Sequence, residues 1–236
     1  MPNKKATFNP REFWDDKILG WETSRYGQVS DTTGQLEKVA RLSSDSVKRR
    51  LELSRKILAP NCIGKKLVEY GCGSAHLAEP LIESGASSYF GFDLAPSAIT
   101  SARQRISNSP HANFIQLEAT DIGTAAKVDA DIVISLGLTD WLDSNQLEQL
   151  ILLSQGRDFL HSFSERRSGL RQRMHRLYVH LAYGRKTSGY VPRYYVVDDI
   201  VAQLERGRSS PVSVVRLREL SFGVLVTSLP IPAELL

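Results

Sequence analysis

The sequence KLVEYGCGSAHL at positions 66–77 decides the fold of this chain. Its first residues read as a short buried strand, Gly71 and Gly73 as a sharp turn, and residues 75–84 as a helix. Glycine lets the backbone approach a ligand without interference from a Cβ atom. The first N–H groups of the helix would point at a ligand over the turn. This stretch therefore predicts a strand, a turn and a helix arranged around a bound ligand.

A second strand with an acidic end follows about twenty residues later, the separation typical of nucleotide-binding βαβ units. Residues 89–93 read YFGFD, and the carboxylate of Asp93, followed by Leu94, stands at the end of this apolar run. A carboxylate in that position can accept hydrogen bonds from both hydroxyls of a ribose. The two strands together predict a nucleoside site. A glycine turn that only links a strand to a helix is the alternative without a ligand.

The spacing of the glycines distinguishes two kinds of nucleoside site. A dinucleotide fingerprint requires a third glycine where this chain has His76, which argues against it. The pattern Glu69-x-Gly71-Cys72-Gly73-x-Ala75 instead resembles the first motif of class I S-adenosylmethionine (SAM) methyltransferases, with alanine where that family usually has glycine. The carboxylate of Glu69 also suits a ligand that carries ammonium and sulfonium charges. The resemblance implies SAM as cofactor, with these five residues in contact with it.

Two later segments resemble further parts of the same family. The predicted strand at residues 113–118 is followed by Asp121 and Ile122, and in the family an acidic residue at this place holds the adenine amino group. The alternative is a solvated loop aspartate. The predicted strand at 129–137 ends in Ser135, Leu136 and Gly137, where the family lines the space between cofactor and acceptor. Since ligands of open α/β sheets bind at the carboxyl ends of the strands, these residues, together with Asp93 and Leu94, are predicted to line one shared cofactor site.

The order of predicted elements gives the fold class and the domain organisation. Alternating strands and helices predict an α/β fold with a Rossmann-like, mostly parallel sheet, closed by an antiparallel pair at 212–219 and 222–227. We expect an N-terminal helical cap at 1–60, a SAM-binding domain at 61–236, and a basic helical lid inserted at 165–193. In the cap, Tyr26 or Arg25 could reach the SAM carboxylate, or the cap residues could simply pack on the sheet.

Composition predicts one soluble, cytoplasmic enzyme domain. The chain has 236 residues, 42% of them hydrophobic, which is enough for a large single core. It contains no apolar run of about 18 residues and no signal-peptide pattern. Its two cysteines, Cys62 and Cys72, give neither a disulfide framework nor metal-ligand spacing, so we expect no metal.

Positive charge is concentrated in the predicted lid. Residues 157–193 carry a net charge of +7, whereas the whole chain carries +4. Three interpretations remain open: a lid whose arginines, such as Arg171, grip an acidic acceptor; a contact with an anionic membrane that holds a lipid-linked acceptor; or a solvated face. Nucleic acid is disfavoured, because the segment lacks interleaved aromatic residues and no Asn-Pro-Pro-Tyr-like motif follows the fourth strand. The oligomeric state is not readable from the sequence.

The segment after the lid resembles the acceptor-facing strand of ubiquinone and magnesium-porphyrin methyltransferases. The resemblance makes Arg193, Tyr194 and Tyr195 candidates for acceptor contact, and packing of both tyrosines under the lid is an equal alternative. A hydroxyl acceptor benefits from a general base, for which His161 is the first candidate and Asp140 the second. An amine acceptor would need only desolvation.

The resulting hypothesis is a SAM-dependent methyltransferase for a small or lipid-linked acidic acceptor, with O-methylation favoured. One alternative is a SAM-binding, catalytically silent methyltransferase-like partner protein, because intact binding motifs do not prove turnover. A second alternative, an NAD(P)-dependent oxidoreductase, is opposed by His76 and by the lack of a recognisable Tyr-x-x-x-Lys pair.

Overall fold

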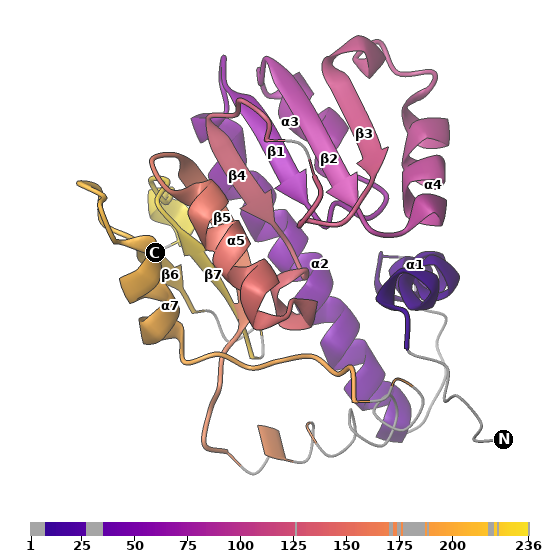
Figure 1. The fold of residues 1–236 in the computed structure, drawn as a ribbon, viewed down its shortest axis with the longest axis vertical. Coiled ribbons are helices and arrows are strands. Elements are labelled where there is room, and N and C mark those ends of the chain that lie inside the picture. Colours follow the sequence, from indigo (N-terminus) through magenta and orange to yellow (C-terminus); the bar gives the residue numbers. More distant parts are fainter. Residues whose placement is uncertain are drawn as a thin grey trace, which may run out of the picture.

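The structure of the chain is a computed structural model. It describes residues 8–26, 35–125, 127–169, 172–173, 176, 187, 189–216, 220 and 222–235, with the backbone alone at 24–26 and 35–45. Within these residues the chain forms one seven-stranded sheet of order β3-β2-β1-β4-β5-β7-β6 (Figure 1).

The sheet is parallel except at its last two strands. β1 (Lys66–Tyr70) lies between β2 (Ser88–Asp93) and β4 (Ile132–Ser135), β3 (Ile115–Ala119) pairs with β2, and β5 (Asp158–Ser164) pairs with β4, all in parallel. β7 (Gly223–Thr227) runs antiparallel to β5 and to β6 (Ser213–Val215). The predicted fold class is confirmed, including the antiparallel closing pair.

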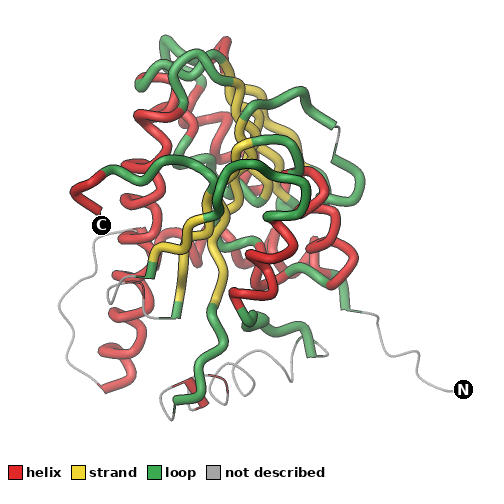
Figure 2. The backbone as a smooth tube through the Cα atoms, turned by 90° about the vertical axis from the view of Figure 1, so that its left-hand side faces the viewer, coloured by secondary structure: helices red, strands yellow, loops and turns green. Residues whose placement is uncertain are grey.

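Helices cover both faces of the sheet. Successive side chains of a strand point to opposite faces, so apolar residues on each face pack against helices. Figure 2 shows this layered arrangement edge-on. On one face Leu67 packs in a core with α2 (Gln35–Asn61), α3 (Ala78–Glu83) and α4 (Pro96–Ile106). On the other face Val68 packs with α5 (Ser144–Ser154) and α7 (Val197–Leu204). Short 3₁₀ helices lie at η1 (Ala112–Phe114), η2 (Thr139–Trp141) and η5 (Ala233–Leu235).

The two N-terminal helices have different positions: one packs in the core and the other lies at the edge of the cavity described below. Leu53, Ile57 and Leu58 of α2 are fully buried in the same core as β1, so this half of the predicted cap belongs to the body of the sheet. α1 (Pro10–Tyr26) packs beside α2 and α4 instead. Figure 1 places α1 next to the carboxyl ends of β2 and β3.

The helix after the glycine turn begins at Ala78, three residues later than predicted. The reason is the backbone of the preceding loop, in which Gly71, Gly73 and Ala75 have φ values of +72°, +53° and +54°. These left-handed conformations cannot belong to a right-handed helix. We call residues 71–77 the glycine loop.

Most of the predicted lid helix at 165–193 lies outside the described residues. Among the parts of the chain that are described, no helix has both the length and the apolar character needed to span a membrane.

Candidate functional site

A cavity of about 320 Å³ lies at the carboxyl ends of β1, β2 and β4. The glycine loop forms its floor, α1 forms one wall, and residues after β3 and β4 form the rest. Ten residues predicted to contact a cofactor line it: Glu69, Gly71, Cys72, Gly73, Asp93, Leu94, Asp121, Ile122, Leu136 and Gly137. Parallel strands bring these separate segments to one edge of the sheet, as the sequence pattern predicted.

The glycine loop is tied to the end of β2. The N–H groups of Gly71 and Cys72 donate to the carbonyl of Phe92 at 2.7 and 3.0 Å, and Gly73 N–H donates to Asp93 Oδ2 at 2.8 Å. A Cβ atom at Gly71 would lie 2.7 Å from Leu138 Cβ, so only glycine fits there. The turn is therefore close-packed, and its glycine leaves room for the residues after β4.

Asp93 is held by backbone donors on both oxygens. Besides Gly73, the N–H of Ala95 donates to Oδ1 at 2.9 Å. Burial raises the pKa of Asp93, and these two backbone N–H groups oppose the rise. Each carboxylate oxygen has two lone pairs, so Asp93 can still accept from a ligand hydroxyl on either oxygen.

Glu69 lies beneath the glycine loop, and its burial favours the neutral form of its carboxyl group. Its side chain is buried and its Oε2 accepts a hydrogen bond from the Tyr89 hydroxyl. Burial raises the pKa of Glu69 to about 8, and the nearby carboxylates of Asp93 and Glu22 add to the rise. Burial thus favours the neutral carboxyl group, and the negative charge expected from the sequence would be stabilised beside a bound cation.

Asp121 is an ordered, half-buried residue of the cavity wall. Its Oδ1 accepts from Gly123 N–H at 2.7 Å and its Oδ2 accepts from Gln146 Nε2 at 3.0 Å. These two bonds fix the carboxylate at the end of β3, which disfavours the interpretation as a solvated loop residue. Gln146 belongs to α5 and also lines the cavity.

Glu22 of α1 is a cavity residue that sequence reasoning missed. Its Oε1 accepts from Ser74 N–H at 2.9 Å, its Oε2 accepts from the Ser74 hydroxyl, and His76 Nε2 lies 3.9 Å from Oε2. The hydrogen bonds from His76 and Ser74 outweigh the effect of burial and lower the pKa of Glu22. Glu22 follows the buried Ile18 by one helical turn, and this spacing could have predicted that Glu22 lies on the inner side of α1.

All three tryptophans of the chain line the cavity, on the side of α1 and η2. Trp14 meets Trp141 edge-on with ring centroids 4.8 Å apart, and Trp14 Nε1 donates to the Tyr190 hydroxyl at 3.0 Å. The ring of Tyr190 lies 5.2 Å from that of Trp141. We call Trp14, Trp141 and Tyr190 the aromatic clasp. Trp141 and Tyr190 were not predicted site residues, because their contact exists only in the folded chain.

His161 does not lie in the cavity. It is buried between β4 and α5, with Nδ1 2.9 Å from Ser135 Oγ and Nε2 2.9 Å from Ser154 Oγ, and it stacks on Phe159. Burial lowers its pKa to about 3. Both ring nitrogens are occupied by serines, so the imidazole has no access to an acceptor. We do not retain it as a general base.

Asp140, the second candidate base, is also turned away from the cavity. Its carboxylate accepts from the Ser164 N–H at 2.9 Å and hydroxyl at 2.7 Å, and its carbonyl accepts from Arg193 N–H. Burial raises the pKa of Asp140. Asp140 therefore connects η2 to the end of β5 and to the segment before α7, and its role is structural.

Two residues predicted to contact the cofactor lie behind the cavity wall. Ser135 is fully buried and bonded to His161, and Ala75 is fully buried in the core beneath the loop. Strand pleating explains Ser135, because its side chain points into the sheet core whereas the following Leu136 and Gly137 line the cavity.

The residues predicted to contact the acceptor lie outside the cavity lining. The Tyr195 hydroxyl donates to Thr139 O at 2.6 Å, which favours the packing interpretation for this residue. Arg193 is exposed, and Tyr194 lies under the Arg176 guanidinium, 5.7 Å from its ring centroid. Arg171 and the side chain of Tyr26 lie outside the described residues.

The segment that supplies the glycine loop and the ends of β2, β3 and β4 matches a known family model. Residues 67–153 match the family model described as methyltransferase domain. This confirms the resemblance to class I methyltransferases over the segment that runs from β1 to α5. No curated protein matches the sequence significantly.

Solved structures share the fold over most of the chain. Magnesium protoporphyrin IX methyltransferase from Synechocystis PCC 6803, with bound S-adenosylhomocysteine (SAH), has 17% identity and a TM-score of 0.67, covering 92% of this chain and 96% of its own. The N-methyltransferase NodS from Bradyrhizobium japonicum WM9, in complex with SAH, has 17% identity and a TM-score of 0.51, covering 78% of this chain and 86% of its own. At this level of identity the likeness establishes the fold.

Proposed function

We propose that this chain, whose residues 67–153 match a methyltransferase domain, transfers a methyl group from SAM to a small or lipid-linked acidic acceptor. The observation that carries the proposal is the position of Asp93, at the end of β2, in the same cavity wall as the glycine loop of β1. This arrangement fits a nucleoside whose ribose lies on the carboxylate.

The remaining cavity residues fit the other parts of SAM. Asp121 and Ile122 lie where an adenine would follow the ribose, and the glycine loop leaves space for the amino-acid part. Glu69 and Asp93 supply carboxyl groups beside the place of the cationic groups. Structural neighbours were crystallised with SAH, which agrees with this assignment.

The role of the protein in such a reaction is to position the reactants and to exclude water. SAM supplies an activated methyl group on its sulfonium, so the acceptor lone pair needs in-line placement behind that methyl. Leu136, Leu138 and the aromatic clasp form apolar surface next to the end of β4. This surface would shield the transfer from bulk water and strengthen the electrostatic contacts inside.

An ionised oxygen is the acceptor atom that best suits the site. Neither of the predicted general bases lines the cavity, and an acceptor carboxylate already carries its lone pairs at neutral pH. The aromatic clasp favours an apolar body on the same molecule. These observations support O-methylation of an acidic acceptor that has an apolar or aromatic part.

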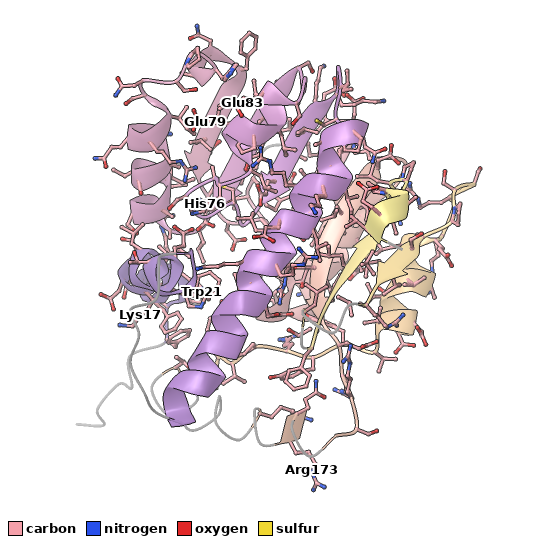
Figure 3. All side chains as sticks on the ribbon, turned by 180° about the vertical axis from the view of Figure 1, so that it is seen from behind. Lys17, Trp21, His76, Glu79, Glu83 and Arg173 are labelled. Carbon is pink, nitrogen blue, oxygen red and sulfur yellow. The ribbon has the colours of Figure 1, made fainter. Side chains whose placement is uncertain are left out.

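The basic insertion is proposed to attract the acid group of the acceptor. Arg173 and Arg176 are exposed, and Figure 3 shows Arg173 pointing outward at the end of the molecule farthest from Glu83. Reversing Arg171, Arg173 and Arg176 to Glu should raise the KM for an acidic acceptor and leave SAH affinity unchanged. Reversal of Arg55 and Lys56, which are exposed on α2, is the matched control. Equal KM values for the two variants would refute this role of the insertion.

The function is tested in two steps. Titration calorimetry with SAH and with NAD⁺ should give binding of SAH alone. Radiolabelled SAM is then offered with panels of carboxylates, phenols and amines that carry apolar bodies, and label should enter the carboxylates. Binding of NAD⁺ without SAH would refute the methyltransferase. SAH binding without transfer to any panel member would favour the catalytically silent partner protein.

A further inference from the structure

The carboxylate of Glu22 occupies a cradle of hydrogen-bond donors on the glycine loop. Ser74 contributes its N–H, 2.9 Å from Oε1, and its hydroxyl, which donates to Oε2. Glu22 and Ser74 are only 8% and 4% exposed, so this contact lies inside the protein. A Cβ atom at position 73 would collide with Glu22 Oε1, so Gly73 is what makes room for the carboxylate.

His76 places an imidazole nitrogen beside the cradle. Its Nδ1 lies 3.1 Å from Arg105 Nη1, and a guanidinium can only donate hydrogen bonds. Nδ1 must therefore accept, which leaves the proton on Nε2, the atom that faces Glu22 Oε2 at 3.9 Å. Figure 3 shows His76 and Trp21, which both line the cavity. The cradle is thus complementary to a carboxylate.

The donors that hold Glu22 are positioned by α4 and by the end of β2, whereas Glu22 itself belongs to α1. Arg105 of α4 donates to the carbonyls of Ser74 and Ala75, the latter at 2.7 Å, and Gly73 N–H is held by Asp93. Glu22 reaches the cradle from α1, which also packs on α2 and α4 and contacts Trp141 and Tyr190 through Trp14. The side chain can therefore leave without dismantling the loop.

We propose that Ser74 and His76 bind the α-carboxylate of SAM, and that in the ligand-free protein Glu22 occupies this place and must be displaced by the cofactor. The inference rests on the proposed function, because it takes SAM as the ligand of the cavity. Two carboxylates cannot both accept from the two Ser74 donors beside His76, so cofactor binding and Glu22 binding exclude each other. Release of Glu22 frees α1 from the loop, which couples cofactor binding to the position of the helix that carries Trp14 and Trp21.

The test compares a ligand that has the carboxylate with one that lacks it. SAH contains the amino-acid part, whereas 5′-methylthioadenosine contains only the nucleoside and thioether. Glu22→Ala should bind SAH about tenfold more tightly or better, because the competing side chain is gone. Its affinity for methylthioadenosine should equal that of the wild type. Glu22→Gln, neutral but nearly isosteric, should show a smaller gain for SAH.

Asp16→Ala is the matched control, since Asp16 is an exposed acid on the same helix, and its SAH affinity should not change. Unchanged or weaker SAH binding by Glu22→Ala, with methylthioadenosine binding intact, would overturn the inference; a weaker value would assign Glu22 to the ammonium group instead. If the wild type binds neither ligand, the proposed function itself fails. Methylthioadenosine binding also reports that each variant has folded around the nucleoside site.

Discussion

The charge of a cavity carboxyl depends on its burial as well as on its residue type, and Glu69 illustrates this. Its pKa is about 8 in the folded protein, against an ordinary value of 4.5. Between these pH values the folded protein keeps a proton that the unfolded chain has lost. The contribution of Glu69 to stability therefore falls as pH rises through this window.

Glu69→Gln should remove this dependence, because glutamine stays neutral and can still accept from the Tyr89 hydroxyl. We expect the melting temperature of the variant, relative to the wild type, to be higher at pH 8 than at pH 5. Thermal unfolding at both pH values measures the difference. Glu12→Gln, at an exposed position of α1, serves as control. A constant difference between the two pH values would contradict the raised pKa.

In the proposed complex, the carboxylate of Asp93 accepts hydrogen bonds from the ribose hydroxyls. Asp93→Ala should weaken SAM binding at least about tenfold, the loss expected for charge-assisted hydrogen bonds to two hydroxyls. Methylthioadenosine should lose affinity to the same extent, because it contains the same ribose. Calorimetry with both ligands measures the effect, and circular dichroism checks the fold of the variant. Unchanged affinity would refute the ribose role.

At the scale of single elements, the start of α5 shows how local hydrogen bonds select a boundary. α5 begins at Ser144 and is capped by Asp143: Oδ1 accepts from Gln146 N–H at 2.9 Å, and Gln146 Oε1 accepts from Asp143 N–H at 3.0 Å. This reciprocal pair is a capping box.

Asp143→Ala should destabilise the protein by about 1 kcal/mol, the usual cost of losing an N-cap. Ser144→Ala, one residue later, removes only a long, exposed hydrogen bond from Arg193 Nη1 at 3.4 Å and should change stability little. Urea denaturation of both variants measures the two free energies of unfolding. Equal losses in the two variants would show that the cap does not contribute as described.

At the scale of the whole molecule, the aromatic clasp connects three segments that are far apart in the sequence. Trp14 belongs to α1, Trp141 to η2 after β4, and Tyr190 to the segment before α7. Together with Phe13, the clasp links the N-terminal helix to the far side of the cavity. Loss of one ring should therefore loosen α1 more than it loosens the sheet.

Trp14→Ala should speed hydrogen exchange of α1 amides and leave exchange in β1 and β4 nearly unchanged. Leu19→Ala, at an exposed position of the same helix, is the matched control. Exchange measured by mass spectrometry compares the two variants. Equal protection of α1 in Trp14→Ala and Leu19→Ala would show that the clasp does not hold the helix.

The residues that the sequence placed correctly share one property: each stands within a few residues of a strand end. Gly71, Asp93, Asp121 and Gly137 could be located from strand patterns, because parallel strands bring their carboxyl ends together. His161 was misjudged by the same logic, since the strand pattern locates the segment but not the face to which a buried side chain points. The lid prediction for 165–193 stays a prediction.

The sequence by itself determined the α/β fold, the glycine loop and the carboxylates around it, because alternation of apolar runs and the backbone freedom of glycine are local properties. Only the tertiary structure decided that Glu22 enters the loop, that Trp14, Trp141 and Tyr190 meet, and that burial raises the pKa of Glu69. Each of these depends on burial and contact between segments distant in the chain, and no local pattern records such distances.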